Sequence, residues 1–114
     1  MLNIVFYFQV HQPYRLTHFN VLDIGNNAKI FDERLNSNVM RKVSKNCYLP
    51  TNQLLLELIQ KYEGRFKVAF SITGTAIEQF KLYSPETLDS FKCLIDTGCV
   101  ELLGETYFHS LSFL

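Results

Sequence analysis

Three stretches of the chain are apolar at nearly every position, and each has the length of a β-strand. They are residues 2–10 (Leu-Asn-Ile-Val-Phe-Tyr-Phe-Gln-Val), residues 66–72 (Phe-Lys-Val-Ala-Phe-Ser-Ile) and residues 99–103 (Cys-Val-Glu-Leu-Leu). Unbroken runs rich in Val, Ile and aromatic residues are typical of strands covered on both faces, as in parallel sheets. The pattern therefore predicts three core strands.

Helical periodicity lies between the predicted strands. Pro50 suits the first turn of a helix that ends at Gly64. Residues 75–78 have capping-box spacing and open a short second helix, and residues 84–86 (Ser-Pro-Glu) begin a third, which ends at residues 96–98 (Asp-Thr-Gly). The apolar faces of the first and third helices are formed by Leu54, Leu55, Leu58, Ile59 and Tyr62, and by Leu88, Phe91, Leu94 and Ile95.

This order of elements predicts an α/β fold with three parallel strands, intervening helices and a long first loop. At 114 residues the chain has room for one domain at most. Residues 11–48 are too many for a plain connection, and Asp32 could cap a short helix there with Leu35, Val39 and Val43 on one face. Loops of this size at the carboxyl edge of a barrel commonly shape a binding cleft.

Composition excludes some classes of partner. The formal net charge is zero, so nothing favours nucleic acid or an anionic membrane surface, and no apolar run approaches the roughly 20 residues of a membrane helix. Residues 2–10 lack the basic flank and the cleavage site of a signal peptide. Cys47, Cys93 and Cys99 have no metal-site spacing, so we expect small buried side chains in a reducing compartment, a cytoplasmic location and no metal or other cofactor.

Polar side chains that could do chemistry follow the first strand. His11 comes directly after it, and Pro13 restricts Gln12 to an extended conformation. An imidazole at this place can reach over the sheet edge and bond a substrate hydroxyl; alternatively it is a partly buried structural histidine. His18, further along the same loop, is expected at the surface.

A second group of polar side chains accompanies the third strand. Glu101 lies inside it, where a carboxylate is costly unless it is paired, so burial would raise its pKa or direct it to a substrate hydroxyl. The alternative is a strand-end residue that points into solvent. Glu105 follows the strand as a loop carboxylate, and His109 lies in a loop that returns over the same edge. The sequence contains no Gly-x-Ser-x-Gly elbow and no phosphate-binding loop.

Five colinear segments resemble glycoside hydrolase family 57, the α-amylase and glucanotransferase group. Residues 8–15 (Phe-Gln-Val-His-Gln-Pro-Tyr-Arg) resemble its first signature, and residues 98–103 (Gly-Cys-Val-Glu-Leu-Leu) are similar to its second, a glycine followed three residues later by glutamate. Residues 47–52, 70–75 and 104–111 are also similar to the α-amylase branch. The resemblance extends over essentially the whole chain.

The resemblance implies a distorted (β/α)7 TIM-like barrel that acts on an α-glucan or maltooligosaccharide with retention of configuration. It also implies that His11, Glu101 and His109 line the sugar pocket, and we expect Gln12 and Glu105 beside them. A retaining glycosidase needs two carboxyl groups roughly 5 Å apart. The family takes them from later signatures, so no catalytic residue is assigned here. We interpret residues 1–114 as an incomplete amino-terminal part of the catalytic domain, inactive alone.

Other interpretations stay open at this point. The chain could be a carbohydrate-binding or complementing subunit of a split enzyme, with a separately encoded carboxyl-terminal half as partner. In that case Tyr14, Tyr107 and Phe108 could stack on sugar rings, although they could equally be packing residues. A metal-dependent deacetylase-like or mannosidase-like barrel would need a His/Asp cluster, and His11 and His109 have no aspartate beside them in sequence. Hydrolysis and glucan transfer are not distinguished.

Overall fold

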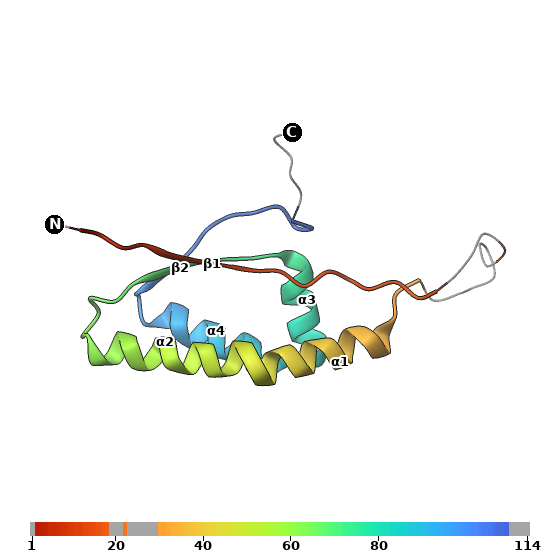
Figure 1. Ribbon diagram of the computed structural model, residues 1–114, viewed down its shortest axis with the longest axis horizontal. Helices are drawn as coiled ribbons and strands as arrows, with labels where there is room; N and C mark the ends of the chain where they lie inside the picture. Colours follow the sequence, from red (N-terminus) through yellow and green to blue (C-terminus); the bar gives the residue numbers. More distant parts are fainter. Residues whose placement is uncertain (1, 19–21, 23–29, 110–114) are drawn as a thin grey trace.

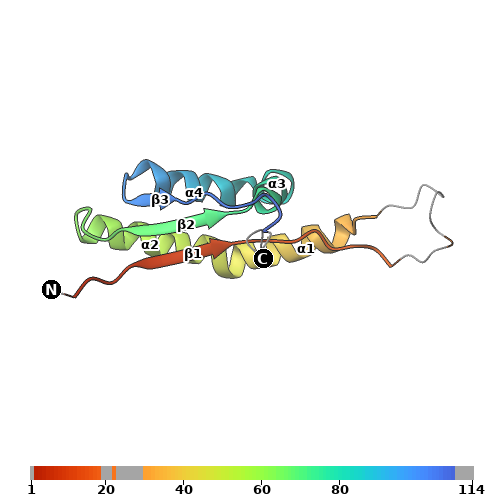
Figure 2. The same cartoon turned by 90° about the horizontal axis from the view of Figure 1, so that it is seen from above.

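The computed structural model describes residues 2–18, 22 and 30–109, and it is built around a parallel sheet with helices on one face (Figure 1). The strands are β1 (Phe6–Val10), β2 (Val68–Ile72) and β3 (Val100–Leu102), hydrogen-bonded in the order β1-β2-β3. Figure 2 shows the strands side by side, with the helices behind them. The predicted α/β class and the parallel strands are confirmed.

The register of the strands decides which side chains share a face. Phe8 pairs with Phe70 and Val10 with Ile72, so these apolar side chains lie over the helices. The intervening positions, among them Gln9 and its partner Ser71, lie on the opposite face. The buried apolar core on the helix side consists of Val10, Met40, Leu55, Ile59, Val68, Phe70, Ala76, Phe80, Phe91 and Leu94.

The expectation that the strand within residues 2–10 is covered on both faces is wrong for the described part of the chain. Positions 2–9 are exposed, and residues 2–5 precede the first paired residue, Phe6. The reason is that the described helices pack on one face of the sheet, while β1 lies at its edge. An apolar run therefore identified a strand correctly but overstated its burial.

The long first loop leads into one continuous helix rather than a short one. It comprises α1 (Glu33–Val43), a π-helical stretch η2 (Ser44–Tyr48) and α2 (Leu49–Lys61). Asp32 caps it as predicted, because its carboxylate accepts a hydrogen bond from the backbone nitrogen of Leu35 at 2.9 Å. Pro50 has no N–H and would crowd the carbonyl one turn earlier, so we attribute the widened turn before it to Pro50.

The buried face of α1 differs from the predicted one. Asn36 and Met40 are buried, whereas Leu35 is 43% exposed. The amide of Asn36 explains the rotation, because it accepts from the backbone nitrogen of Arg15 at 2.9 Å and donates to the carbonyl of Arg15 at 3.3 Å. Polar tethering to the first loop therefore competes with the apolar pattern in setting the orientation of this helix.

Two further helices connect β2 to β3. In α3 (Gly74–Tyr83) the cap is Thr73 rather than Thr75, and its hydroxyl accepts from the nitrogen of Ala76 at 3.3 Å. Thr73 is the extended residue that follows β2 directly, which is the conformation a cap requires. The helix α4 (Pro85–Asp96) begins after Ser84 and ends before Gly98, whose φ is +77°, as predicted.

The cysteines are another correction. Cys47 and Cys93 are exposed and Cys99 is half-buried, so the expectation of three buried side chains is wrong. The reason is that Cys47 in η2 and Cys93 in α4 lie on the exposed sides of their helices. Within the described residues, no helix combines the length and the apolar character needed to cross a bilayer.

Candidate functional site

The carboxyl ends of the parallel strands bring polar side chains together at one edge of the sheet. His11 follows β1, Thr73 follows β2, and the loop after β3 carries Glu105 and His109 back over the same edge. We call this group the polar cluster; its members are Gln9, His11, Ser71, Thr73, Glu105 and His109. In parallel α/β folds ligands bind at this edge.

Thr73, which directly follows β2, orients the side chain of His11. Its Nδ1 lies 3.0 Å from the hydroxyl of Thr73, which is fully buried and also caps α3. The start of a helix therefore fixes the hydrogen-bond partner of the imidazole. Burial lowers the pKa of His11, the neighbouring His109 lowers it further, and Glu105 acts in the opposite direction. The ring is accordingly neutral near pH 7 and can both donate and accept hydrogen bonds.

His109 is held by Gln9 and Glu105. Its Nδ1 lies 2.6 Å from the amide nitrogen of Gln9 and 3.1 Å from the Glu105 carboxylate, and the Gln9 amide also donates to that carboxylate at 3.3 Å. When Nδ1 carries no proton it accepts a hydrogen bond from the amide of Gln9, and when it is protonated it donates a hydrogen bond to Glu105. Burial raises the pKa of Glu105, but Ser71, His109 and Gln9 stabilise the carboxylate more, so its pKa lies below the ordinary value.

The two imidazoles face each other across the edge of the sheet. The ring centroids of His11 and His109 are 5.0 Å apart, although the residues are far apart in sequence. His109 adopts a positive φ of 57°, which is uncommon for a residue with a side chain. Its backbone nitrogen donates to the carbonyl of Thr106 at 3.2 Å, which closes a tight turn. The turn thus places the imidazole of His109 next to that of His11.

Gln12 is directed into the protein. Its side-chain nitrogen donates to the hydroxyl of Tyr48 at 2.8 Å, and its side-chain oxygen accepts from Arg15 at 3.0 Å. Its backbone carbonyl accepts from the buried amide of Gln79 at 2.8 Å. These contacts give Gln12 a structural role, which is to seat the segment after β1 on two helices. The contact between Gln12 and sugar stays a prediction.

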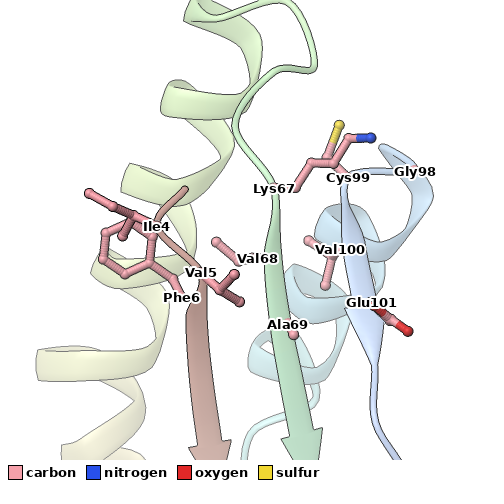
Figure 3. Close-up of a pocket in the computed structure, with 10 residues that line it drawn as sticks. All are labelled: Ile4, Val5, Phe6, Lys67, Val68, Ala69, Gly98, Cys99, Val100 and Glu101. Atoms are coloured by element: carbon pink, nitrogen blue, oxygen red, sulfur yellow. The ribbon is translucent and has the colours of Figure 1, made fainter. Parts of the chain in front are cut away.

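Glu101 does not join the polar cluster. It pairs with Ala69, which pairs with Tyr7, so it shares a face with His11 but lies four residues nearer the amino-terminal edge, about 13 Å along the strand direction. The carboxylate is exposed, which is the alternative of the two sequence interpretations, and Figure 3 shows it turned away from β2. The burial expected for this carboxylate is therefore not found.

A hollow of about 350 Å³ lies at the amino-terminal edge of the sheet, near Glu101. Its lining residues include Lys67, Cys99 and Glu101 (Figure 3). It lies at the amino-terminal edge, away from both imidazoles, so His11 and Glu101 do not face a common hollow in the described part of the chain. The sugar-binding role of Glu101 stays a prediction. His18 is exposed in the first loop, and no group of three or more metal-ligating side chains is found among the described residues.

A comparison with family models now identifies the chain. The model described as Glycosyl hydrolase family 57 matches residues 5–114. The chain belongs to glycosyl hydrolase family 57. A protein of Methanocaldococcus jannaschii named "Putative alpha-amylase" is 49% identical over 113 residues, and the match covers 97% of this chain and 24% of that protein. This family 57 chain therefore spans about a quarter of the length of that curated relative. No solved structure matches it.

Sequence reasoning missed part of the site in this family 57 chain. Gln9, Ser71 and Thr73 contribute to the polar cluster, and Tyr7 approaches Ser71 with 2.6 Å between the two hydroxyls. The signal that could have indicated Gln9 is its spacing. Tyr7, Gln9 and His11 alternate with apolar residues along β1 and directly after it, which is typical of side chains on one face.

Proposed function

We propose that the chain forms the amino-terminal part of a glycoside hydrolase catalytic barrel and that its polar cluster binds an α-glucan. The observation that carries this proposal is the pair of imidazoles, His11 and His109, held side by side at the carboxyl edge of a parallel sheet. Membership of a glycosyl hydrolase family and the name of the curated relative support the substrate class. Three parallel strands with helices on one face are compatible with part of a distorted (β/α)7 barrel.

The cluster has the chemistry to hold sugar hydroxyls. Two imidazoles next to a carboxylate offer donors and acceptors on the same side of the site, and Thr73 and Gln9 hold the rings in place. Because these partners come from strands and a helix start, the hydrogen-bonding groups are in position before a ligand arrives. Such pre-positioning reduces the entropy lost on binding.

Bond cleavage needs more than the described residues supply. A retaining mechanism uses two carboxyl groups about 5 Å apart, one as nucleophile and one as acid/base. Glu105 is engaged by His109 and Gln9, and Glu101 lies at the other end of the sheet. We therefore assign neither role to them and expect the chain alone to bind glucan without cleaving it. A carboxyl-terminal half, encoded separately or on the same chain, would supply the catalytic pair. Hydrolysis, glucan transfer and the cytoplasmic location stay predictions.

Calorimetric titration of the chain with maltotriose tests the proposal. We expect saturable binding by the unaltered chain and a loss of at least about tenfold in affinity for His11→Ala, since a hydrogen-bonding group in the site is removed. Tyr62→Ala is the control, because Tyr62 lies at the far end of α2 and outside the cluster. Absence of binding by the unaltered chain, or equal binding by His11→Ala, would contradict the proposal. Release of reducing ends by the chain alone would contradict its inactivity.

A further inference from the structure

An aromatic groove lies next to the polar cluster. It has a volume of about 390 Å³, and it brings together side chains from the first loop, α3 and the loop after β3. We call it the aromatic groove; its lining residues include Tyr14, Phe31, Glu78, Leu82, Tyr107 and Phe108. Its volume lies within the range of about 300–1,000 Å³ that is usual for ligand sites.

The rings of the groove are arranged in two pairs. The centroids of Tyr14 and Phe31 are 4.9 Å apart on one side, and those of Tyr107 and Phe108 are 4.9 Å apart on the other. Phe31 is about half exposed and Phe108 is largely exposed, although large apolar side chains are usually drawn into the core. Ring faces held in position while open to solvent are a feature that stacking ligands use.

A carboxylate lies between the two pairs. Glu78 accepts a hydrogen bond from the hydroxyl of Tyr14 at 2.5 Å. Hydrogen bonds from Tyr107 and then from Tyr14 lower the pKa of Glu78, so it is ionised at neutral pH. The carboxylate remains exposed, and it can therefore accept further hydrogen bonds from a ligand. A groove for a purely apolar ligand would have no use for a charged group at this place.

The groove is continuous with the polar cluster. A smaller hollow of about 210 Å³ is lined by Tyr14, Phe31 and Phe108, which also line the groove, and by His11 and Thr75. A chain-like ligand with one unit at His11 would therefore pass directly between the aromatic rings. This continuity selects an extended polymer over an unrelated small molecule.

We propose that the aromatic groove binds further glucose residues of the α-glucan whose leading residue lies at His11. This inference rests on the proposed function. A pyranose ring has an apolar face of C–H groups that stacks on aromatic rings, and the hydroxyls around its rim can donate hydrogen bonds to a carboxylate. Phe31 and Phe108 supply the ring faces, and Glu78 supplies the acceptor.

Calorimetric titration of the full chain with maltose and with maltohexaose tests the groove. For the unaltered chain we expect maltohexaose to bind about tenfold more tightly than maltose. For Phe31→Ala and for Phe108→Ala we expect the affinity for maltohexaose to fall roughly 3- to 10-fold, as for the loss of one aromatic contact, and to fall by more than the affinity for maltose does, so that the advantage of maltohexaose over maltose shrinks. Tyr62→Ala is a matched control, because Tyr62 is 47% exposed and Phe31 is 49% exposed. Far-UV circular dichroism confirms that each variant is folded.

The outcomes separate the two proposals. If Phe31→Ala and Phe108→Ala both still bind maltohexaose about tenfold more tightly than maltose, the groove assignment is overturned while glucan binding at His11 stands. If cellohexaose binds the unaltered chain as tightly as maltohexaose, the α-linked ligand is overturned. If neither maltose nor maltohexaose binds the unaltered chain, the proposed function fails, and the groove assignment fails with it. Loss of the gain in Phe31→Ala and in Phe108→Ala, but not in Tyr62→Ala, supports the groove.

Discussion

Replacing Gly74 by alanine should separate the stability of the fold from the integrity of the polar cluster. Gly74 is the first residue of α3, and the ring of Tyr107 lies directly over it. A Cβ at position 74 would come within 2.0 Å of Cδ2 and 2.6 Å of Cγ of that ring. Ordinary contacts between carbon atoms are about 3.5–4.0 Å, so the ring must move by well over 1 Å. Cγ is attached next to the backbone, so a side-chain rotation alone does not relieve the overlap.

The expected effect on stability is small. Alanine is about 1 kcal/mol more favourable than glycine in a helix, and overpacking costs about 1–3 kcal/mol. The difference is a loss of about 0–2 kcal/mol, which lowers Tm by at most about 15 °C in a domain of this size. Displacement of Tyr107 acts on its neighbours in the loop, since Thr75 donates to the Tyr107 carbonyl and His109 follows two residues later. We therefore expect a loss of at least about tenfold in affinity for maltotriose.

Thermal unfolding followed by circular dichroism and calorimetric titration with maltotriose measure the two effects. Gly104→Ala is the matched control, because Gly104 lies in the same loop and a Cβ there would meet nothing within 4 Å. The reasoning is refuted if Gly74→Ala binds maltotriose as the unaltered chain does. It is equally refuted if Gly104→Ala loses affinity to the same extent.

Three further predictions concern pH, the core and the first loop. Because folding lowers the pKa of His11, the imidazole is protonated more readily in the unfolded chain, so the free energy of unfolding falls as the pH drops below 6.5. The lowered pKa of Glu105 causes a further fall in the free energy of unfolding below pH 4.5. In urea titrations across this range, His11→Gln should remove the part of the pH dependence that begins at pH 6.5. Met40→Ala should cost about 2–5 kcal/mol in urea unfolding because Met40 is fully buried, whereas Leu35→Ala on the exposed side should cost less than about 1 kcal/mol. Gln12→Ala should cost about 1–3 kcal/mol, because it removes the hydrogen-bond donor to the Tyr48 hydroxyl and one of the acceptors of Arg15; an unchanged urea midpoint would contradict the role assigned to it.

Much of the fold could be predicted from the sequence because local signals agree with the tertiary packing. Gly98 adopts the left-handed conformation that ends α4, and Pro50 begins a helical turn, as their chemistry requires. The continuity of the helix from Glu33 to Lys61 could not be predicted, because a proline ordinarily suggests a boundary. The π-helical turn before Pro50 accommodates it, and only the three-dimensional structure shows that turn.

The candidate site was predicted in part. The carboxyl-edge rule brought His11 and His109 to the correct place, since it depends only on strand direction. Glu101 was expected to be buried because its sequence neighbours are apolar, but β3 lies at the edge of the described sheet, where a side chain can turn outward. Gln9 was missed because a single polar residue in an apolar run carries little signal until the face to which it points is known.

The most direct test of the account uses the three histidines of the chain, whose ring protons can be followed by NMR during a titration with maltohexaose. His11 and His109 lie in the polar cluster, and His18 is exposed in the first loop, so it serves as an internal control. We predict that the resonances of His11 and His109 shift together and saturate at the same ligand concentration, while that of His18 does not move. Equal shifts for all three histidines, or no shift for His11 and His109, would contradict the claim that these two imidazoles hold an α-glucan.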